Sequence, residues 1–289
     1  MSEMASGYRG PHKVSTIRNS RNLGGTDHGI ARGREASGEI VVGAAGDDVS
    51  EPERTSRIVD AFKSDSNAGA VFSAVSIIDE TSKTIAAYAK RPLHGVKPRI
   101  FLDKPNSETV IQGCSAAYKR WVFDIPLSTG RHSYAEDIIF SFYLNILESE
   151  ILYIDAPLVR YRTHSAAASN YLSPDPAEHE KRLLRSAGLT LEIVDEFERL
   201  AASVGKSHAL RGRELAVARE FARDQSVWPH LTFPQRLIRT LKSAFEGDFR
   251  FSLRRGAWRT VRLWGQFPNY QPKMSVSPIQ RKYRLRGRE

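Results

Sequence analysis

The distribution of apolar and polar residues predicts an α/β domain followed by helices. Residues 39–44 and 70–79 form short, nearly continuous apolar runs, as in strands of a sheet covered on both faces. We expect residues 84–90 to pair beside the 70–79 strand. Residues 151–164 predict a short strand, a proline-containing turn and another strand. Because helical segments alternate with these strands, we expect the α/β domain to extend to about residue 172.

Two helix starts are marked by the capping-box spacing, a serine with a glutamate three positions later. Ser50 and Glu53 predict a helix from about residue 51 to residue 63. Ser133 and Glu136 open a strongly apolar helix that ends near residue 148. Both helices lie between predicted strands, as an α/β domain requires.

The chain becomes helical after residue 172. Apolar residues recur at helical spacing over 183–204, and the same pattern is repeated over 208–224. Two amphipathic segments with arginines on their polar face follow. The sequence thus predicts three parts: a partial α/β domain (1–172), a helical extension (173–232) and a basic amphipathic tail (233–289).

The net charge of +10 comes from this tail. Residues 233–289 contain 14 Lys and Arg and 3 Asp and Glu, a charge of +11, whereas the first 232 residues carry −1. Arginines interleaved with Phe and Trp suit a helix that lies on an anionic membrane surface. Helices that pack on the α/β domain and show arginines to solvent are an alternative. Nucleic-acid binding is a third interpretation, which no recognised motif supports.

Cysteine usage and the start of the chain predict a cytoplasmic protein. The single cysteine, Cys114, excludes an internal disulfide and fits a reducing compartment. The first residues are polar and contain no apolar core of a signal peptide. No run approaches the roughly 18 apolar residues of a spanning helix. We therefore expect a cytoplasmic location, with the tail allowing attachment to the inner face of the membrane.

Two adjacent carboxylates, Asp47 and Asp48, follow the strand predicted at 39–44. In open α/β sheets, ligands gather outside the carboxyl ends of strands. Carboxylates there bind Mg²⁺ or Mn²⁺, often together with substrate phosphates. Aspartates are also common in surface turns. The pair by itself does not choose between a metal site and a turn.

A second acidic pair, Glu136 and Asp137, stands near the start of the predicted 134–148 helix. The partial positive charge of a helix N-terminus favours ionised carboxylates. Asp137 has the chemistry of a weak general base for an attacking hydroxyl group. The capping box alone accounts for Glu136, whereas Asp137 has no structural explanation beyond the helix dipole.

The third candidate is the segment VRYRTHS, residues 159–165. Arg160 and Arg162 would share one face of a strand, and the guanidinium fork suits phosphate recognition. His164 could bind a metal or be an ordinary loop residue.

Five segments in this order resemble the landmarks of a family 2 glycosyltransferase with the GT-A fold, over about residues 15–170. They are NSRNLGG (19–25), ASGEIVVGAAGDDVSEPER (36–54), GCSAAYKRWVFD (113–124), YAEDIIFSFYLNIL (134–147) and YIDAPLVRYRTH (153–164). The form AAGDD…PER looks like bacterial enzymes of surface-polysaccharide assembly.

The resemblance implies inverting transfer of a sugar from a nucleotide-sugar donor to a glycan or lipid-linked acceptor. Asp47 matches the last Asp of the Asp-x-Asp motif, which holds Mg²⁺ or Mn²⁺ on the diphosphate, and His164 resembles a position near that metal or the diphosphate. Asp137 matches the general base that removes the acceptor proton, and Glu136 is its neighbour at the acceptor site. Asn22 matches an asparagine that lines the nucleotide pocket.

Arg160 and Arg162 would help the metal neutralise the departing diphosphate. The chain departs from the family pattern in two places. Ala45 replaces the first Asp of Asp-x-Asp, and the chain begins at what resembles the segment after the initial β-α-β unit. We therefore expect a partial GT-A (Rossmann-like) mixed sheet with flanking helices. The alternative function is a non-catalytic remnant or a membrane-surface binding protein.

Overall fold

The computed structural model describes residues 2–89, 111–127, 136–163 and 176–227, with a few positions between His230 and Ile238. The chain divides into two compact units, which are considered separately. The first comprises Met1–Ala167 and Gly188–Arg219, and the second comprises Ala168–Ala187 and Glu220–Glu289. The candidate site lies in the first unit.

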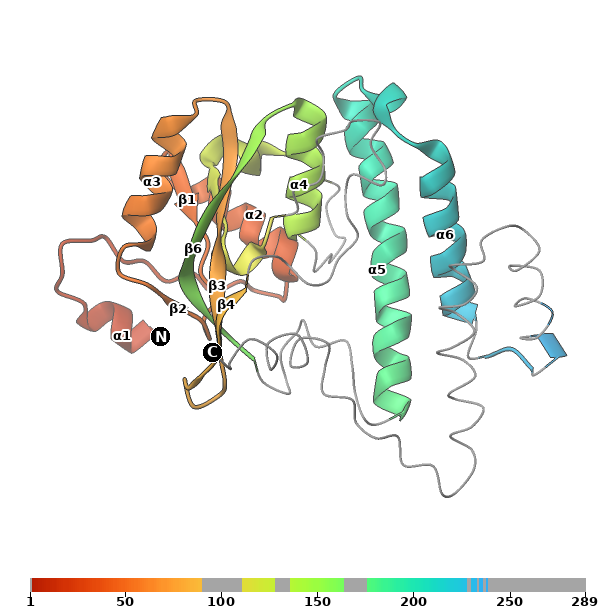
Figure 1. Ribbon diagram of the computed structural model, residues 1–289, viewed down its shortest axis with the longest axis horizontal. Helices are drawn as coiled ribbons and strands as arrows, with labels where there is room; N and C mark the ends of the chain where they lie inside the picture. Colours follow the sequence, from red (N-terminus) through yellow and green to blue (C-terminus); the bar gives the residue numbers. More distant parts are fainter. Residues whose placement is uncertain are drawn as a thin grey trace, which may run out of the picture. The chain divides into compact units, whose positions relative to one another are not determined.

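The first unit is built on a six-stranded mixed sheet (Figure 1). Its strands are β1 (Ile40–Val42), β2 (Val49–Ser50), β3 (Ala68–Ile78), β4 (Thr84–Ala89), β5 (Ala117–Lys119) and β6 (Glu150–Arg162). Their order is β1-β5-β3-β6-β2, and β4 pairs with the second half of β3. Strands β3 and β6 are parallel, whereas the remaining pairs are antiparallel.

Helices cover both faces of this sheet (Figure 1). The α-helices are α1 (Ser2–Gly7), α2 (Gly25–Glu35), α3 (Arg54–Ser64), α4 (Glu136–Leu147), α5 (Pro176–Ser203) and α6 (Gly212–Val227). Short 3-10 helices are η2 (Gly113–Ser115), η3 (Arg120–Asp124) and η4 (Ser207–Ala209). Helix α3 packs Ile58 and Phe62 against one face, and α2 and α4 pack against the other. The predicted fold class, a mixed α/β sheet with flanking helices followed by a helical segment, is confirmed.

Strand β3 lies at the centre of the sheet, and all eleven of its residues are buried. This burial explains its nearly continuous apolar sequence, because side chains on both faces contact protein. The predicted strand at 70–79 and the pairing of 84–90 beside it are both confirmed. On the α4 side, Phe142 stacks on Phe197 of α5 with ring centroids 3.9 Å apart, which extends the core to the first part of the helical segment.

The predicted start of α3 is wrong, because no capping box forms. The helix begins at Arg54, and Glu53 makes no side-chain hydrogen bond to the helix start. Ser50 belongs to β2, where its Oγ accepts a hydrogen bond from Arg54. The pairing of Ser50 with Val159 of β6 takes precedence over the local capping signal.

The predicted turn at Pro157 is also wrong, because β6 is one strand of thirteen residues. The register with β3 shifts between the pairs Ser73–Ile154 and Ala74–Pro157. Proline lacks the N–H that a regular ladder needs, but it is tolerated at such an irregularity. The strand therefore continues past Pro157.

Several sequence predictions fall outside the described residues. They concern the cap at Ser133, the ligand His164 and nearly all of the 233–289 tail. The boundaries of the three predicted parts stay predictions. Within the described part of the chain, no helix is both long enough and apolar enough to cross a membrane.

Candidate active site

The turn formed by η2 is fixed between the centre of the sheet and the start of α4. Ser115 Oγ donates a hydrogen bond to the Ser73 carbonyl over 2.9 Å and accepts one from the Ser73 N–H over 3.2 Å. Just before the turn, the Ile111 N–H donates to Ser141 Oγ over 2.9 Å. The Ser141 hydroxyl donates in turn to the Asp137 carbonyl over 2.6 Å. These buried bonds hold the turn against the first residues of α4.

Glu136 and Asp137, the predicted acidic pair, face this turn. The Asp137 carboxylate accepts hydrogen bonds from the N–H groups of Ile138, over 2.9 Å, and Gly113. Burial nevertheless raises the Asp137 pKa above its ordinary value. Burial and the neighbouring Asp137 raise the pKa of Glu136 to about 7. Near neutral pH, Glu136 therefore titrates between a hydrogen-bond donor and a second anion.

Gly113 leaves room beside these carboxylates. A Cβ at this position would lie 3.4 Å from Asp137 Cβ, 3.5 Å from Glu136 Oε1 and 3.6 Å from Asp137 Oδ2. Two buried polar atoms nearby on the chain, Gln112 Oε1 and Tyr118 Oη, have no hydrogen-bond partner. The charges of Asp137 and Glu136 both act on the Tyr118 hydroxyl, which places it close to the acidic pair. The site thus combines two desolvated carboxylates with polar atoms that still need partners.

Asp48, more than Asp47, is turned toward this cluster. Asp48 Oδ1 accepts a hydrogen bond from the Arg162 N–H over 2.9 Å, and Oδ2 is buried without a partner. Burial raises the Asp48 pKa, and the charge of Asp47 adds to the effect. Asp47 itself is exposed on the loop between β1 and β2. The two adjacent carboxylates therefore have different environments.

The Cys114 thiol is within reach of acidic groups from two segments of the chain. Burial, followed by the charges of Asp48 and Asp137, raises the pKa of its thiol to about 12. The thiol is therefore protonated at neutral pH and is not a nucleophile. Its position brings Asp48 and Asp137, which are 89 residues apart in the sequence, to the same site.

Arg54 ties together the segments that carry the acidic residues. It is 2% exposed, and its guanidinium donates to Ser50 Oγ over 2.9 Å and to the Gly43 carbonyl over 2.7 Å. It also reaches the carbonyls of Cys114 and Ala116, each over 3.5 Å. These contacts join the end of β1, the end of β2 and the η2 turn.

The two predicted arginines of β6 lie beside the aspartate loop, and both contact protein groups. Arg160 forms an ion pair with Glu51, with Nε and Oε1 3.3 Å apart. Arg162 Nε donates to the Asp47 carbonyl over 2.8 Å, and its other nitrogens bind the β3–β4 turn at Asp79, Glu80 and Ser82. Arg162 therefore fixes the position of the loop that carries Asp47 and Asp48. Contacts of either arginine with a substrate stay a prediction.

Asn22, the predicted nucleotide-pocket residue, has a local contact. Its Oδ1 accepts a hydrogen bond from the Gly24 N–H over 2.9 Å, just before α2 begins. This bond stabilises an Asx-type turn. A nucleotide contact of Asn22 stays a prediction.

The aspartate loop offers part of the oxygen donor set that Mg²⁺ and Mn²⁺ prefer. The described residues contain no group of three or more His, Cys, Asp and Glu side chains placed to hold a metal. These ions often use one or two carboxylates together with substrate phosphates. The exposed Asp47 and the unpaired Asp48 Oδ2 fit such a partial donor set.

Part of this site lies in a region of the chain that is similar to a known protein family. Residues 2–125 match the family model Glycosyl transferase family 2. The match spans less than half of the chain, includes the aspartate loop and the η2 turn, and ends before Glu136. It supports a glycosyltransferase-like function.

One similar solved structure is the crystal structure of Staphylococcus aureus TarS 1–349 in complex with UDP-GlcNAc. The two chains are 13% identical, with a TM-score of 0.45, over 85% of this chain and 78% of that chain. A likeness of this degree carries no argument about the site. No curated protein matches the sequence.

Sequence reasoning missed the structural importance of Arg54 and Gly113. A signal for Arg54 was present, because Arg54, Ile58 and Phe62 recur at a spacing of four and are all buried. An arginine on the apolar stripe of a helix needs buried partners. The contacts of Asp48 and Gly113 had no comparable signal, because they join residues distant in the sequence.

Proposed function

We propose that the protein transfers a sugar from a nucleotide-sugar donor to a hydroxyl of a glycan or lipid-linked acceptor, with inversion. The observation that carries this proposal is the meeting of the aspartate loop, the η2 turn and Asp137 in one partly buried cluster. The family match over residues 2–125 supports the reaction class.

In this proposal Asp137 is the general base. The hydrogen bonds from Ile138 and Gly113 orient its carboxylate, and Ser141 fixes the backbone that carries it. A raised pKa strengthens the base, because proton transfer is most efficient when the pKa of the base approaches the working pH. Asp137 must be ionised, so we expect transfer to increase with pH through a pKa above the ordinary carboxyl range. Glu136, when protonated, can donate a hydrogen bond to the acceptor.

Asp47 would hold Mg²⁺ or Mn²⁺ at the loop that Arg162 keeps in place. When bound, the metal would neutralise charge on the departing diphosphate. Asp48 would support the loop through its hydrogen bond to the Arg162 N–H. Arg54 acts as a positioning residue, because it joins this loop to the turn beside Asp137.

The test uses the full chain, a panel of uridine-, guanosine- and thymidine-diphosphate sugars, and Mg²⁺ or Mn²⁺. Release of nucleoside diphosphate is measured for the wild type, Asp137→Asn and Asp60→Asn. Asp60 provides the matched control because it is an exposed aspartate on α3. We expect Asp137→Asn to lower turnover by about 10²–10⁴-fold while Asp60→Asn keeps it.

Two results would contradict the proposal. One is equal turnover in Asp137→Asn and the wild type. The other is the absence of donor binding by titration calorimetry with metal present, which would favour the non-catalytic remnant. Thermal unfolding of each variant shows whether a loss of turnover reflects a loss of folding.

A further inference from the structure

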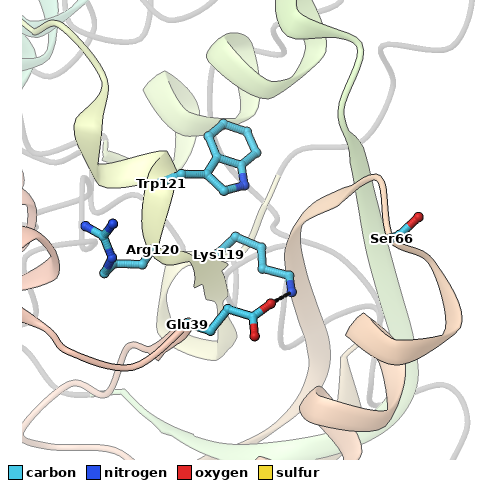
Figure 2. A pocket seen from close by; sticks show the side chains of 5 residues that line it. All are labelled: Glu39, Ser66, Lys119, Arg120 and Trp121. Atoms are coloured by element: carbon cyan, nitrogen blue, oxygen red, sulfur yellow. Dashed lines mark hydrogen bonds and ion pairs between the residues drawn. The ribbon is translucent and has the colours of Figure 1, made fainter.

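A second place with the features of a binding site lies at the other end of β5 from the η2 turn. A hollow of ≈ 330 Å³ is lined by Glu39, Ser66, Lys119, Arg120 and Trp121 (Figure 2). This volume lies at the lower end of the range for small-ligand sites, which begins at roughly 300 Å³. Ser115 bonds to Ser73 of β3, whereas Tyr118 pairs with Ala70, three residues away along the same strand, a span of about 10 Å. The hollow is thus separate from the acidic cluster.

Trp121 provides a fixed apolar wall. A Cβ on Gly69 would lie 3.2 Å from Trp121 Cζ2, so the edge of the indole rests against the start of β3. The side chain is nevertheless 40% exposed, which is high for so large an apolar group. Figure 2 shows the indole beside the Lys119 side chain. An anchored aromatic ring with an open surface loses little conformational entropy when a ligand packs on it.

The polar groups beside the indole are held in place before any ligand arrives. Lys119 forms an ion pair with Glu39 (Figure 2). Its Nζ also lies 5.2 Å from the centroid of the Phe62 ring. The hydrogen bond and the charge of Lys119 lower the Glu39 pKa, so its carboxylate accepts hydrogen bonds at neutral pH. The Arg120 N–H donates to the Glu39 carbonyl over 2.8 Å, which ties η3 to the start of β1.

The charges at the hollow disfavour an anionic ligand. Lys119 is neutralised by Glu39, and the Arg120 guanidinium points away from Lys119 and Trp121 in Figure 2. Nη1 of Arg120 also lies 4.0 Å from Asp124 Oδ2. A phosphate or carboxylate would find no pair of converging cations here. A wholly apolar ligand would leave the ion pair desolvated without compensation.

A sugar ring satisfies both conditions. One face of many sugar rings presents C–H groups that pack on an aromatic ring, and the rim carries hydroxyl groups that donate and accept hydrogen bonds. Lys119 can donate to such hydroxyls and Glu39 can accept from them. We propose that this hollow binds a neutral sugar of a glycan chain. That the chain belongs to the acceptor rests on the proposed function, but the binding itself does not.

Binding can be measured on the full chain by NMR of the indole N–H groups. The sequence has four tryptophans, and the signal missing from Trp121→Phe identifies Trp121. The probes are chitotetraose, maltotetraose and mannotetraose, with uridine monophosphate and inorganic phosphate for comparison. We expect at least one tetrasaccharide to shift the Trp121 signal saturably, in the millimolar range.

Two variants and one control make the result decisive. Trp121→Ala, which lacks the reporter signal and is therefore titrated by calorimetry alongside the wild type, should abolish saccharide binding, whereas Tyr88→Ala, which removes another exposed aromatic ring, should retain it. Asp137→Asn should also retain it, so a failure of catalysis and a failure of this site are distinguishable. The proposal is overturned if no tetrasaccharide binds, if binding survives Trp121→Ala, or if only phosphate or the nucleotide shifts the signal.

Discussion

The two ends of strand β5 place carboxylates in opposite electrostatic conditions. Before the strand, Asp48, Glu136 and Asp137 surround the η2 turn, and burial raises all three pKa values. After the strand, Lys119 lowers the pKa of the exposed Glu39. The same chemical group is thus driven toward its neutral form by desolvation at one end and toward its charged form by a cation at the other. Only the carboxylates before the strand have the raised pKa values that suit acid–base chemistry near neutral pH.

The largest expected effect comes from removing Arg54, whose guanidinium contacts the η2 turn beside the three buried carboxylates. Arg54→Ala leaves the carbonyls of Gly43, Cys114 and Ala116 with fewer donors in a buried place. We expect the free energy of unfolding, measured with urea, to fall by about 3–5 kcal/mol. Arg57→Ala, which removes an exposed arginine of the same helix, should change it by about 0.5 kcal/mol or less. Equal effects of the two changes would show that Arg54 does not hold this end together.

The second prediction tests the desolvation of Glu136 through pH. Its pKa is about 7 in the folded protein and 4.5 in an unfolded chain. Below pH 4.5 both states carry the proton, so Glu136→Gln should not change stability. Between pH 4.5 and 7, the unfolded chain releases the Glu136 proton while the folded protein keeps it. Rising pH therefore lowers the free energy of unfolding of the wild type.

Above pH 7, Glu136→Gln should therefore be more stable than the wild type by at most about 3 kcal/mol, since each pH unit between the two pKa values is worth about 1.4 kcal/mol. Urea unfolding across this pH range measures the difference. Glu80→Gln, at an exposed turn position, serves as the control and should show no such rise. A difference independent of pH would contradict burial as the cause.

The third prediction separates function from folding at the acidic end. In Gly113→Ala the new methyl group would meet Glu136 and Asp137 at ordinary contact distances, so stability should change by less than about 1 kcal/mol. The methyl fills space beside Asp137 Oδ2 that an acceptor hydroxyl requires. We expect sugar transfer to fall by at least about 10-fold, a difference of about 1.4 kcal/mol. Gly29→Ala in α2, where a Cβ would meet nothing within 4 Å, should retain full turnover.

The smallest effect is expected at the exposed end. Glu39→Gln removes the partner of Lys119, but water screens this ion pair. The urea midpoint should change little, and any change should vanish at high salt. A large, salt-independent loss would mean that this end also depends on a desolvated carboxylate, and the contrast between the two ends would not hold.

The sequence predicted elements well where one pattern dominated. The apolar run of β3 and the strongly apolar α4 were recognised because burial on every side requires apolar residues throughout. It failed at Ser50 and Pro157, where local signals for a cap and a turn conflicted with strand pairing to β6. Strand pairing depends on distant residues, so local preference could not reveal it.

The candidate site's residue types can be read from the chain alone: paired aspartates after a strand, an acidic pair at a helix start, and arginines near the end of β6. Their burial and neighbours follow from how distant segments pack together. The fold partly buries Asp48 within reach of Cys114, leaves Asp47 exposed, and engages Arg162 with backbone carbonyls. The physical reason is that a pKa, and with it a chemical role, depends on burial and on neighbours brought together from distant parts of the chain.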